Sequence, residues 1–158
     1  MQNQNIIPNI SEKLLAFNIR PSVQRLAIYQ FLCENHIHPT ADTIYAALVP
    51  NMPTLSRTTV YNTLKQFVDC GLVQTITIED GILRFDADTT NHIHFKCRCC
   101  GEVFDIFTDF SQSKNFLPQG FLLEKIQTNV WGVCQNCQIF QLFPSLFCQN
   151  CQNKEGNN

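Results

Sequence analysis

The sequence predicts an α+β protein in two parts, a helical N-terminal part ending in a β-hairpin and a smaller, strand-rich C-terminal part. Apolar residues recur at helical spacing as far as residue 71 and alternate in residues 72–78, and from His92 onward the pattern becomes strand-rich and cysteine-bearing. Two Cys-x-x-Cys pairs follow, Cys97 with Cys100 and Cys134 with Cys137. The change at residue 72 predicts the hairpin that ends the first part, the change at His92 predicts the second part, and the cysteine pairs predict a metal in that part.

Length and composition limit the class of protein. The 158 residues, 44% of them hydrophobic, allow one medium domain or two small ones, each with a core. No apolar run is long enough to cross a bilayer, and the first residues lack the features of a secretion signal, so we expect a cytoplasmic protein. In that reducing compartment, nine cysteines favour metal binding or redox chemistry over disulfides.

Four helices are expected between residues 10 and 71, because a residue that can cap an N-terminus precedes each apolar run. The capping residues are Ser11, Ser22, Thr40 and Ser56. The fourth helix has the clearest apolar stripe, at i, i+4, i+7 and i+8: Val60, Leu64, Phe67 and Val68. Gly71 stands where a helix usually ends.

A two-stranded hairpin should follow the fourth helix. Residues 72–78 alternate, residues 79–81 form a turn, and residues 82–85 form the second strand. Helices followed by such a wing predict a winged helix-turn-helix, a DNA-binding arrangement. We place this domain at 1–85, a hinge at 86–91, a zinc-containing domain at 92–143 and a flexible tail at 144–158.

The fourth helix carries a polar face that could enter the major groove of double-stranded DNA: Arg57, Thr58, Tyr61, Asn62 and Lys65. Arginine and asparagine can make bidentate contacts to guanine and adenine. Arg20 and Arg25, near the start of the second helix, could meet a phosphate or the minor groove. The alternatives are a solvated helix face and ordinary surface arginines. The net charge of -2 does not by itself indicate a nucleic-acid partner.

The cysteine pairs predict a structural zinc site. Each Cys-x-x-Cys can direct two sulfurs at one ion, and four thiolates make a closed tetrahedral site without an open position. Loss of the metal should unfold the surrounding domain. Reduced or disulfide-forming thiols are the alternative.

His92 and His94 suggest a second, different metal site. On a strand, residues two apart point to the same face, so two imidazoles would lie together. Two imidazoles are half of a metal site, whereas a lone His-x-His is more often surface decoration. Composition and spacing alone do not name the remaining ligands.

Taken together, the motifs resemble the ferric-uptake-regulator (Fur) family of metal-sensing transcriptional regulators. The resemblance runs from about Ile10 to Cys137. It rests on the segments Arg20-Pro21-Ser22-Val23-Gln24-Arg25, His38-Pro39-Thr40-Ala41-Asp42, Thr58-Thr59-Val60-Tyr61-Asn62-Thr63-Leu64, Gly71-Leu72-Val73, Arg84-Phe85-Asp86, His92 to Gly101 and Trp131 to Cys137.

Within that family the chain looks most like the peroxide-sensing (PerR) branch. The iron-uptake branch typically has glutamate where Asp86 stands. The resemblance implies a regulatory Fe(II) or Mn(II) site at the hinge with five ligands: His38, Asp86, His92, His94 and Asp105. It also implies a homodimer, formed by a C-terminal α/β dimerisation domain, that binds a pseudo-palindromic operator.

The implied function is a metal-dependent transcriptional repressor without enzymatic activity. In the peroxide-sensing branch, iron-driven oxidation of a ligating histidine, His38 or His92 here, releases the repressor from DNA, whereas Mn(II) holds it without efficient oxidation. Three alternatives remain open: an iron-uptake regulator, a non-haem iron enzyme, and a thiol switch that uses Cys99, Cys148 and Cys151.

Overall fold

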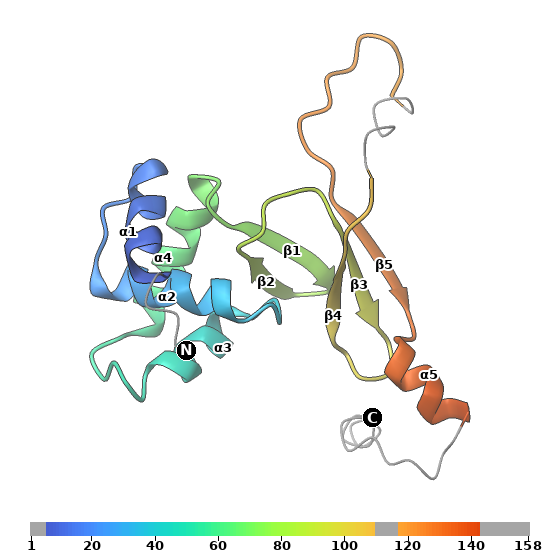
Figure 1. Cartoon of the computed structure of the whole chain (residues 1–158), viewed down its shortest axis with the longest axis horizontal. Coiled ribbons are helices and arrows are strands. Elements are labelled where there is room, and N and C mark those ends of the chain that lie inside the picture. Colours follow the sequence, from blue (N-terminus) through green and yellow to red (C-terminus); the bar gives the residue numbers. More distant parts are fainter. Residues whose placement is uncertain (1–5, 110–116, 143–158) are drawn as a thin grey trace. The chain divides into compact units, whose positions relative to one another are not determined.

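The computed structural model describes residues 6–109 and 117–142 (Figure 1). The α+β class is confirmed, with helices and a hairpin in the N-terminal half and a small sheet in the C-terminal half. The chain divides into two compact units between Thr90 and Asn91. The predicted tail with Cys148 and Cys151 lies outside the described residues. Within residues 6–109 and 117–142, no helix combines the length and apolar character needed to cross a membrane.

The N-terminal unit begins with four helices: α1 Ile6–Ala16, α2 Val23–Glu34, α3 Ala41–Leu48 and α4 Arg57–Asp69. Three of the predicted caps are confirmed. The side-chain oxygens of Ser22, Thr40 and Ser56 accept the backbone N–H three residues later, at 3.3, 3.1 and 3.0 Å. These contacts satisfy N–H groups that have no partner inside the helix.

The first helix begins earlier than expected. It starts at Ile6, so the prediction that Ser11 caps it is wrong, and Ser11 lies inside the helix. Pro8 falls in the first turn, where a missing N–H costs no helical hydrogen bond. The helix can therefore include residues that precede the apparent cap.

The end of α4 leads directly into the hairpin. Gly71 adopts φ +74°, a left-handed conformation that favours glycine. Its N–H donates to the carbonyl of Val68, and the N–H of Leu72 donates to the carbonyl of Phe67, both at 2.9 Å. Strands β1 Gln74–Glu79 and β2 Ile82–Asp86 then pair antiparallel around Gly81, with φ +70°.

The four helices and the hairpin share one core. Buried side chains come from all of them, among them Leu14, Ile28, Ile44, Leu64, Phe67 and Phe85. The rings of Tyr29 on α2 and Phe67 on α4 meet edge to face, 5.8 Å apart. Because the apolar stripe of α4 is buried, its polar stripe must face solvent.

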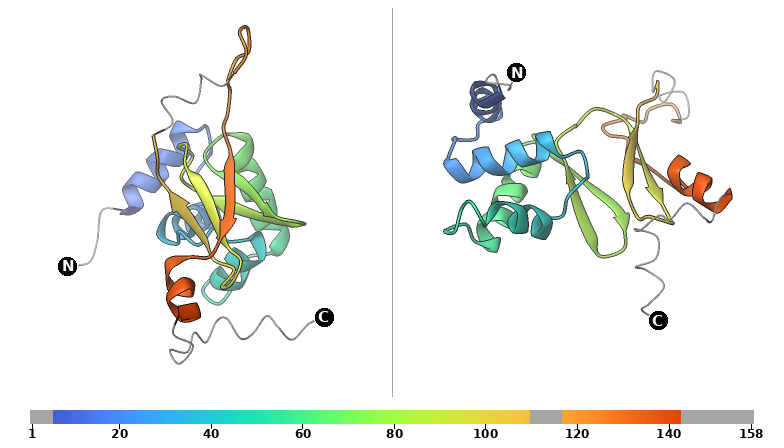
Figure 2. Two further views of the ribbon diagram at one scale, coloured as in Figure 1. Left: turned by 90° about the vertical axis from the view of Figure 1, so that its right-hand side faces the viewer. Right: turned by 60° about the horizontal axis from the view of Figure 1, so that its bottom comes forward.

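The C-terminal unit is a three-stranded sheet followed by a helix. Its elements are β3 Ile93–Cys97, β4 Val103–Ile106, β5 Thr128–Gly132 and α5 Gln135–Leu142 (Figure 2). The strand order is β4-β3-β5, with β3 antiparallel to β4 and parallel to β5. At the C-terminal ends of the parallel strands β3 and β5, Cys97 is the partner of Gly132.

Candidate metal centres and nucleic-acid interface

The structure brings all four predicted zinc cysteines together. Cys97 ends β3, Cys134 follows β5, and Cys137 lies in the first turn of α5. Their sulfurs, with that of Cys100, lie within 4.8 Å of one another, and Cys100 Sγ is 3.9 Å from Cys134 Sγ. Four sulfurs bonded to zinc at about 2.3 Å in a tetrahedron would stand about 3.8 Å apart. The cluster therefore fits this ion.

Two of these thiols have opposite pKa shifts. Burial acts to raise the pKa of Cys97, but backbone N–H groups directed at its sulfur outweigh it and lower the pKa to about 6. One of them, the N–H of Cys134, lies 3.3 Å from the sulfur. Burial raises the pKa of Cys100. Metal binding therefore has to displace at least one proton from the cluster at neutral pH.

His92, His94 and Asp105 converge on the sheet of the C-terminal unit. His94 on β3 pairs in register with Asp105 on β4. The two imidazole Nε2 atoms are 2.9 Å apart, and Asp105 Oδ1 lies 3.3 Å from that of His92 and 3.8 Å from that of His94. Ligand atoms about 2.1 Å from an ion, at right angles, stand about 3 Å apart. These donors therefore fit a shared cation.

In the N-terminal unit, His38 lies beside the second strand of the hairpin, and Asp86 is the last residue of that strand. Arg84 Nη1 donates to the carbonyl of His38 at 3.1 Å, and the N–H of Phe85 donates to the carbonyl of Pro39 at 3.0 Å. His38 has φ +49°, a strained conformation for a residue with a side chain, and such strain concentrates at functional sites.

The carboxylate of Asp86 is oriented by neighbours. It accepts hydrogen bonds from Gln74 Nε2 at 3.0 Å and from the N–H of Asp88 at 2.8 Å. Gln74 also donates to the carbonyl of Asp88, at 2.6 Å. A carboxylate held in this way loses little freedom when it binds a cation. Gln74 carries no signal of this role in the sequence, because its contact with Asp86 depends on the register of β1 with β2.

All five residues of the predicted recognition face on α4 are exposed: Arg57, Thr58, Tyr61, Asn62 and Lys65. Three of them have partners. Lys65 Nζ lies 2.7 Å from Asp69 Oδ2, one turn along the helix. Arg57 and Tyr61 both contact Asp42 on α3, and the guanidinium of Arg57 stacks 4.7 Å above the ring of Tyr45.

Asp42 is a further candidate functional residue, whose contacts with Arg57 and Tyr61 were not predicted from the sequence. The sequence shows only that Asp42 is an acidic residue in the first turn of α3, the helix before α4. The side chains that it contacts depend on how α3 packs against α4.

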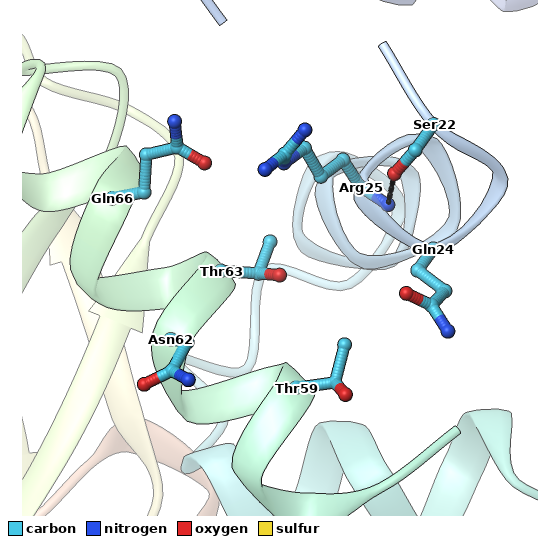
Figure 3. A pocket seen from close by; sticks show the side chains of 7 residues that line it. All are labelled: Ser22, Gln24, Arg25, Thr59, Asn62, Thr63 and Gln66. Carbon is cyan, nitrogen blue, oxygen red and sulfur yellow. Dashed lines mark hydrogen bonds between the residues drawn. The ribbon is translucent and has the colours of Figure 1, made fainter. Parts of the chain in front are cut away.

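A polar groove of about 620 Å³ runs between α2 and α4 (Figure 3). It is lined by Ser22, Gln24, Arg25, Thr59, Asn62, Thr63 and Gln66. Of the two other predicted DNA contacts, Arg25 extends into this groove, and Arg20 is exposed nearby. Arg25 Nη1 donates to the backbone carbonyl of Arg20 at 2.9 Å, which ties the segment before α2 to the first turn of that helix.

A winged-helix unit with an exposed recognition helix, joined to a unit with clustered metal-type ligands, defines the class of metal-dependent DNA-binding regulators. The model of the ferric uptake regulator family matches residues 16–130. The chain belongs to this family, which confirms the resemblance seen in the sequence.

Its relatives include peroxide-responsive regulators. The peroxide-responsive repressor PerR of Staphylococcus aureus (strain Mu50 / ATCC 700699) is 38% identical over 123 residues, which are 76% of this chain and 83% of that protein. The ferric uptake regulator of Vibrio cholerae has a TM-score of 0.65 at 26% identity, covering 78% of this chain and 98% of that chain. The ferric uptake regulator from Pseudomonas aeruginosa, solved with manganese, has a TM-score of 0.64 at 27% identity, covering 79% of this chain and 97% of that chain.

Proposed function

We propose that this chain is a metal-dependent transcriptional repressor that senses peroxide. Membership of the family supports the class, a metal-dependent regulator. The similarity to peroxide-responsive repressors supports peroxide as the stimulus. The observation that carries the proposal is the convergence of His92, His94 and Asp105 without a thiolate. Imidazole and carboxylate donors of this kind suit Fe(II) and Mn(II).

In this proposal His38 and Asp86 complete the regulatory site, so that its ligands come from both units. Zinc at Cys97, Cys100, Cys134 and Cys137 keeps the C-terminal unit folded. Bound Fe(II) would supply the electrons that reduce peroxide, and an adjacent histidine, His38 or His92, would take up oxygen. A ligand that favours one arrangement of two units shifts the population towards it. Damage to a ligand therefore weakens operator binding.

The test compares two metals on one DNA. Zinc-loaded protein is given Fe(II) or Mn(II) and bound to the duplex that it selects from a randomised pool. Low peroxide should release the Fe(II) form and leave the Mn(II) form bound, and peptide mass spectrometry should find added oxygen on His38 or His92.

The matched control for His38 is His36, an exposed histidine two residues away. His38→Ala should abolish metal-dependent DNA binding, and His36→Ala should retain it. An Fe(II) form that stays bound after peroxide, with no oxidised histidine, would favour an iron-uptake regulator instead. Release accompanied by disulfides rather than oxidised histidine would favour a thiol switch.

We also propose that the chain acts as a homodimer that covers the apolar face of its C-terminal sheet. Phe104 and Ile106 on β4 are 39% and 43% exposed and pair in register with Phe95 and Ile93 on β3. Together with Val133 and residues near it, Phe95, Phe104 and Ile106 line an apolar groove of about 440 Å³. A second copy of the chain is the occupant that the family implies.

Sedimentation velocity tests the dimer. Phe104→Asp places a charge in the proposed contact and should shift the protein to monomer. Leu83→Asp changes a similarly exposed apolar residue of the hairpin, 45% exposed, and should leave the dimer intact. A Phe104→Asp protein that remains a dimer at micromolar concentration contradicts this interface.

A further inference from the structure

Four side chains from two helices form one cluster on the exposed surface of the N-terminal unit. The helix before the recognition helix, α3, contributes Asp42 and Tyr45, three residues apart. The recognition helix, α4, contributes Arg57 and Tyr61, four residues apart. These spacings place each pair on one face of its helix.

Asp42 holds both residues of α4. One of its carboxylate oxygens pairs with Arg57 Nη1, and the other accepts the hydroxyl of Tyr61 at 3.3 Å. The ring of Tyr45 lies 4.7 Å beneath the guanidinium. Arg57 is therefore fixed by a charge on one side and by an aromatic face on another, which limits the directions in which it can point.

Folding stability alone does not account for this cluster, because the side chains of Arg57 and Asp42 are 61% and 56% exposed. Ion pairs in such positions contribute little to stability. Arg57 is also the first residue of α4, where the helix dipole disfavours a cation. A carboxylate that holds this arginine offsets that cost and keeps its other N–H groups available.

We propose that Asp42 is a specificity-determining residue that positions Arg57, together with Tyr61, to read a guanine in each operator half-site. The N-terminal residues of a recognition helix are those that meet base edges in the major groove. Arginine reads guanine through paired contacts to O6 and N7, which require a fixed guanidinium plane. Asp42 does not itself touch the base in this arrangement.

This inference rests on the proposed DNA-binding function, and it predicts a change in DNA affinity opposite to the usual effect of removing a negative charge. Removing a negative charge near DNA normally strengthens binding to every sequence, because phosphates then meet less repulsion. If Asp42 positions Arg57, Asp42→Asn should instead weaken binding to the selected operator. Binding to a scrambled duplex of the same composition should stay equal or become stronger.

The experiment measures the ratio of the two Kd values at one salt concentration, by fluorescence anisotropy on the full-length, Mn(II)-loaded protein. Asp42→Asn should lower this discrimination on the order of tenfold. The control Glu34→Gln removes an exposed charge that is hydrogen-bonded within α2, by Gln30 at 2.8 Å, and should leave the ratio unchanged. Thermal unfolding checks that both variants remain folded.

A double-mutant cycle with Arg57→Lys separates positioning from a structural role. Lysine keeps the charge but loses the planar fork, so discrimination should fall in the single variant and fall little further when Asp42→Asn is added. Equal strengthening on both duplexes in Asp42→Asn, or fully additive losses in the cycle, overturns the inference. Failure of the unaltered protein to select any duplex contradicts the proposed function instead.

Discussion

At the scale of single residues, the cysteine cluster shows how the backbone prepares a thiol for metal. Backbone N–H groups directed at Cys97 overcome the effect of burial and lower its pKa to about 6, whereas burial raises the pKa of Cys100. In zinc-free protein at neutral pH, Cys97 is therefore largely thiolate, and acidification through about pH 6 returns its proton. Because zinc competes with protons for the thiolate, its affinity should fall as pH falls.

Replacing Cys97 should remove the zinc and unfold the C-terminal unit. Three remaining thiolates cannot close a tetrahedral site, and structural zinc contributes folding free energy outright. Cys99→Ser is the matched control, because Cys99 lies two residues away but does not belong to the four-sulfur cluster. Metal analysis and circular dichroism should show zinc lost from Cys97→Ser and kept by Cys99→Ser. A Cys97→Ser protein with full zinc content contradicts the assignment.

The sequence predicted residue types better than residue partners. The alternation of a strand was enough to place His92 and His94 on one face. Asp105 joins them only because β4 pairs with β3 in one register, and a shift by one residue would turn its side chain to the other face. Its assignment therefore came from the family resemblance and not from the pattern.

At the scale of helices and strands, local signals decided what could be predicted. Caps and helical spacing act over a few residues, so α2, α3 and α4 begin where the sequence indicates. The prediction for Ser11 was wrong because a serine inside a helix resembles an N-cap when the residues before it are expected to be irregular. The parallel pairing of β3 with β5 joins residues about 35 apart, and no local signal encodes such a pairing.

The two serines give a matched test of capping. Ser56→Ala removes the oxygen that accepts the N–H of Thr59, and it should lower the free energy of unfolding of the N-terminal unit by about 1 kcal/mol. Ser11→Ala changes a residue inside α1, where alanine is the better helix former, and should be neutral or slightly stabilising. Urea unfolding followed by circular dichroism measures both. Equal losses in the two variants would contradict the cap at Ser56.

At the scale of the whole molecule, the proposed regulatory site would couple metal binding in one unit to DNA binding by the other. The boundary between Thr90 and Asn91 separates His38 and Asp86 from His92, His94 and Asp105. An ion bound by ligands from one unit could stabilise only that unit. If ligands from both units bind the ion, its loss also affects the DNA-binding unit. Joint coordination, rather than affinity alone, therefore distinguishes a sensor from a second structural metal.

Calorimetry of the zinc-loaded protein can test this coupling. Without Mn(II), the two units should unfold in separate transitions. Saturating Mn(II) binds the folded form and should raise the transition of the N-terminal unit, by about 2.7 kcal/mol of stabilisation at a hundredfold excess over Kd. His38→Ala should abolish that rise, and His36→Ala should keep it, because His36 is exposed. If Mn(II) raises only the transition of the C-terminal unit in the unaltered protein, His38 and Asp86 are not ligands, and the metal cannot control DNA binding through them.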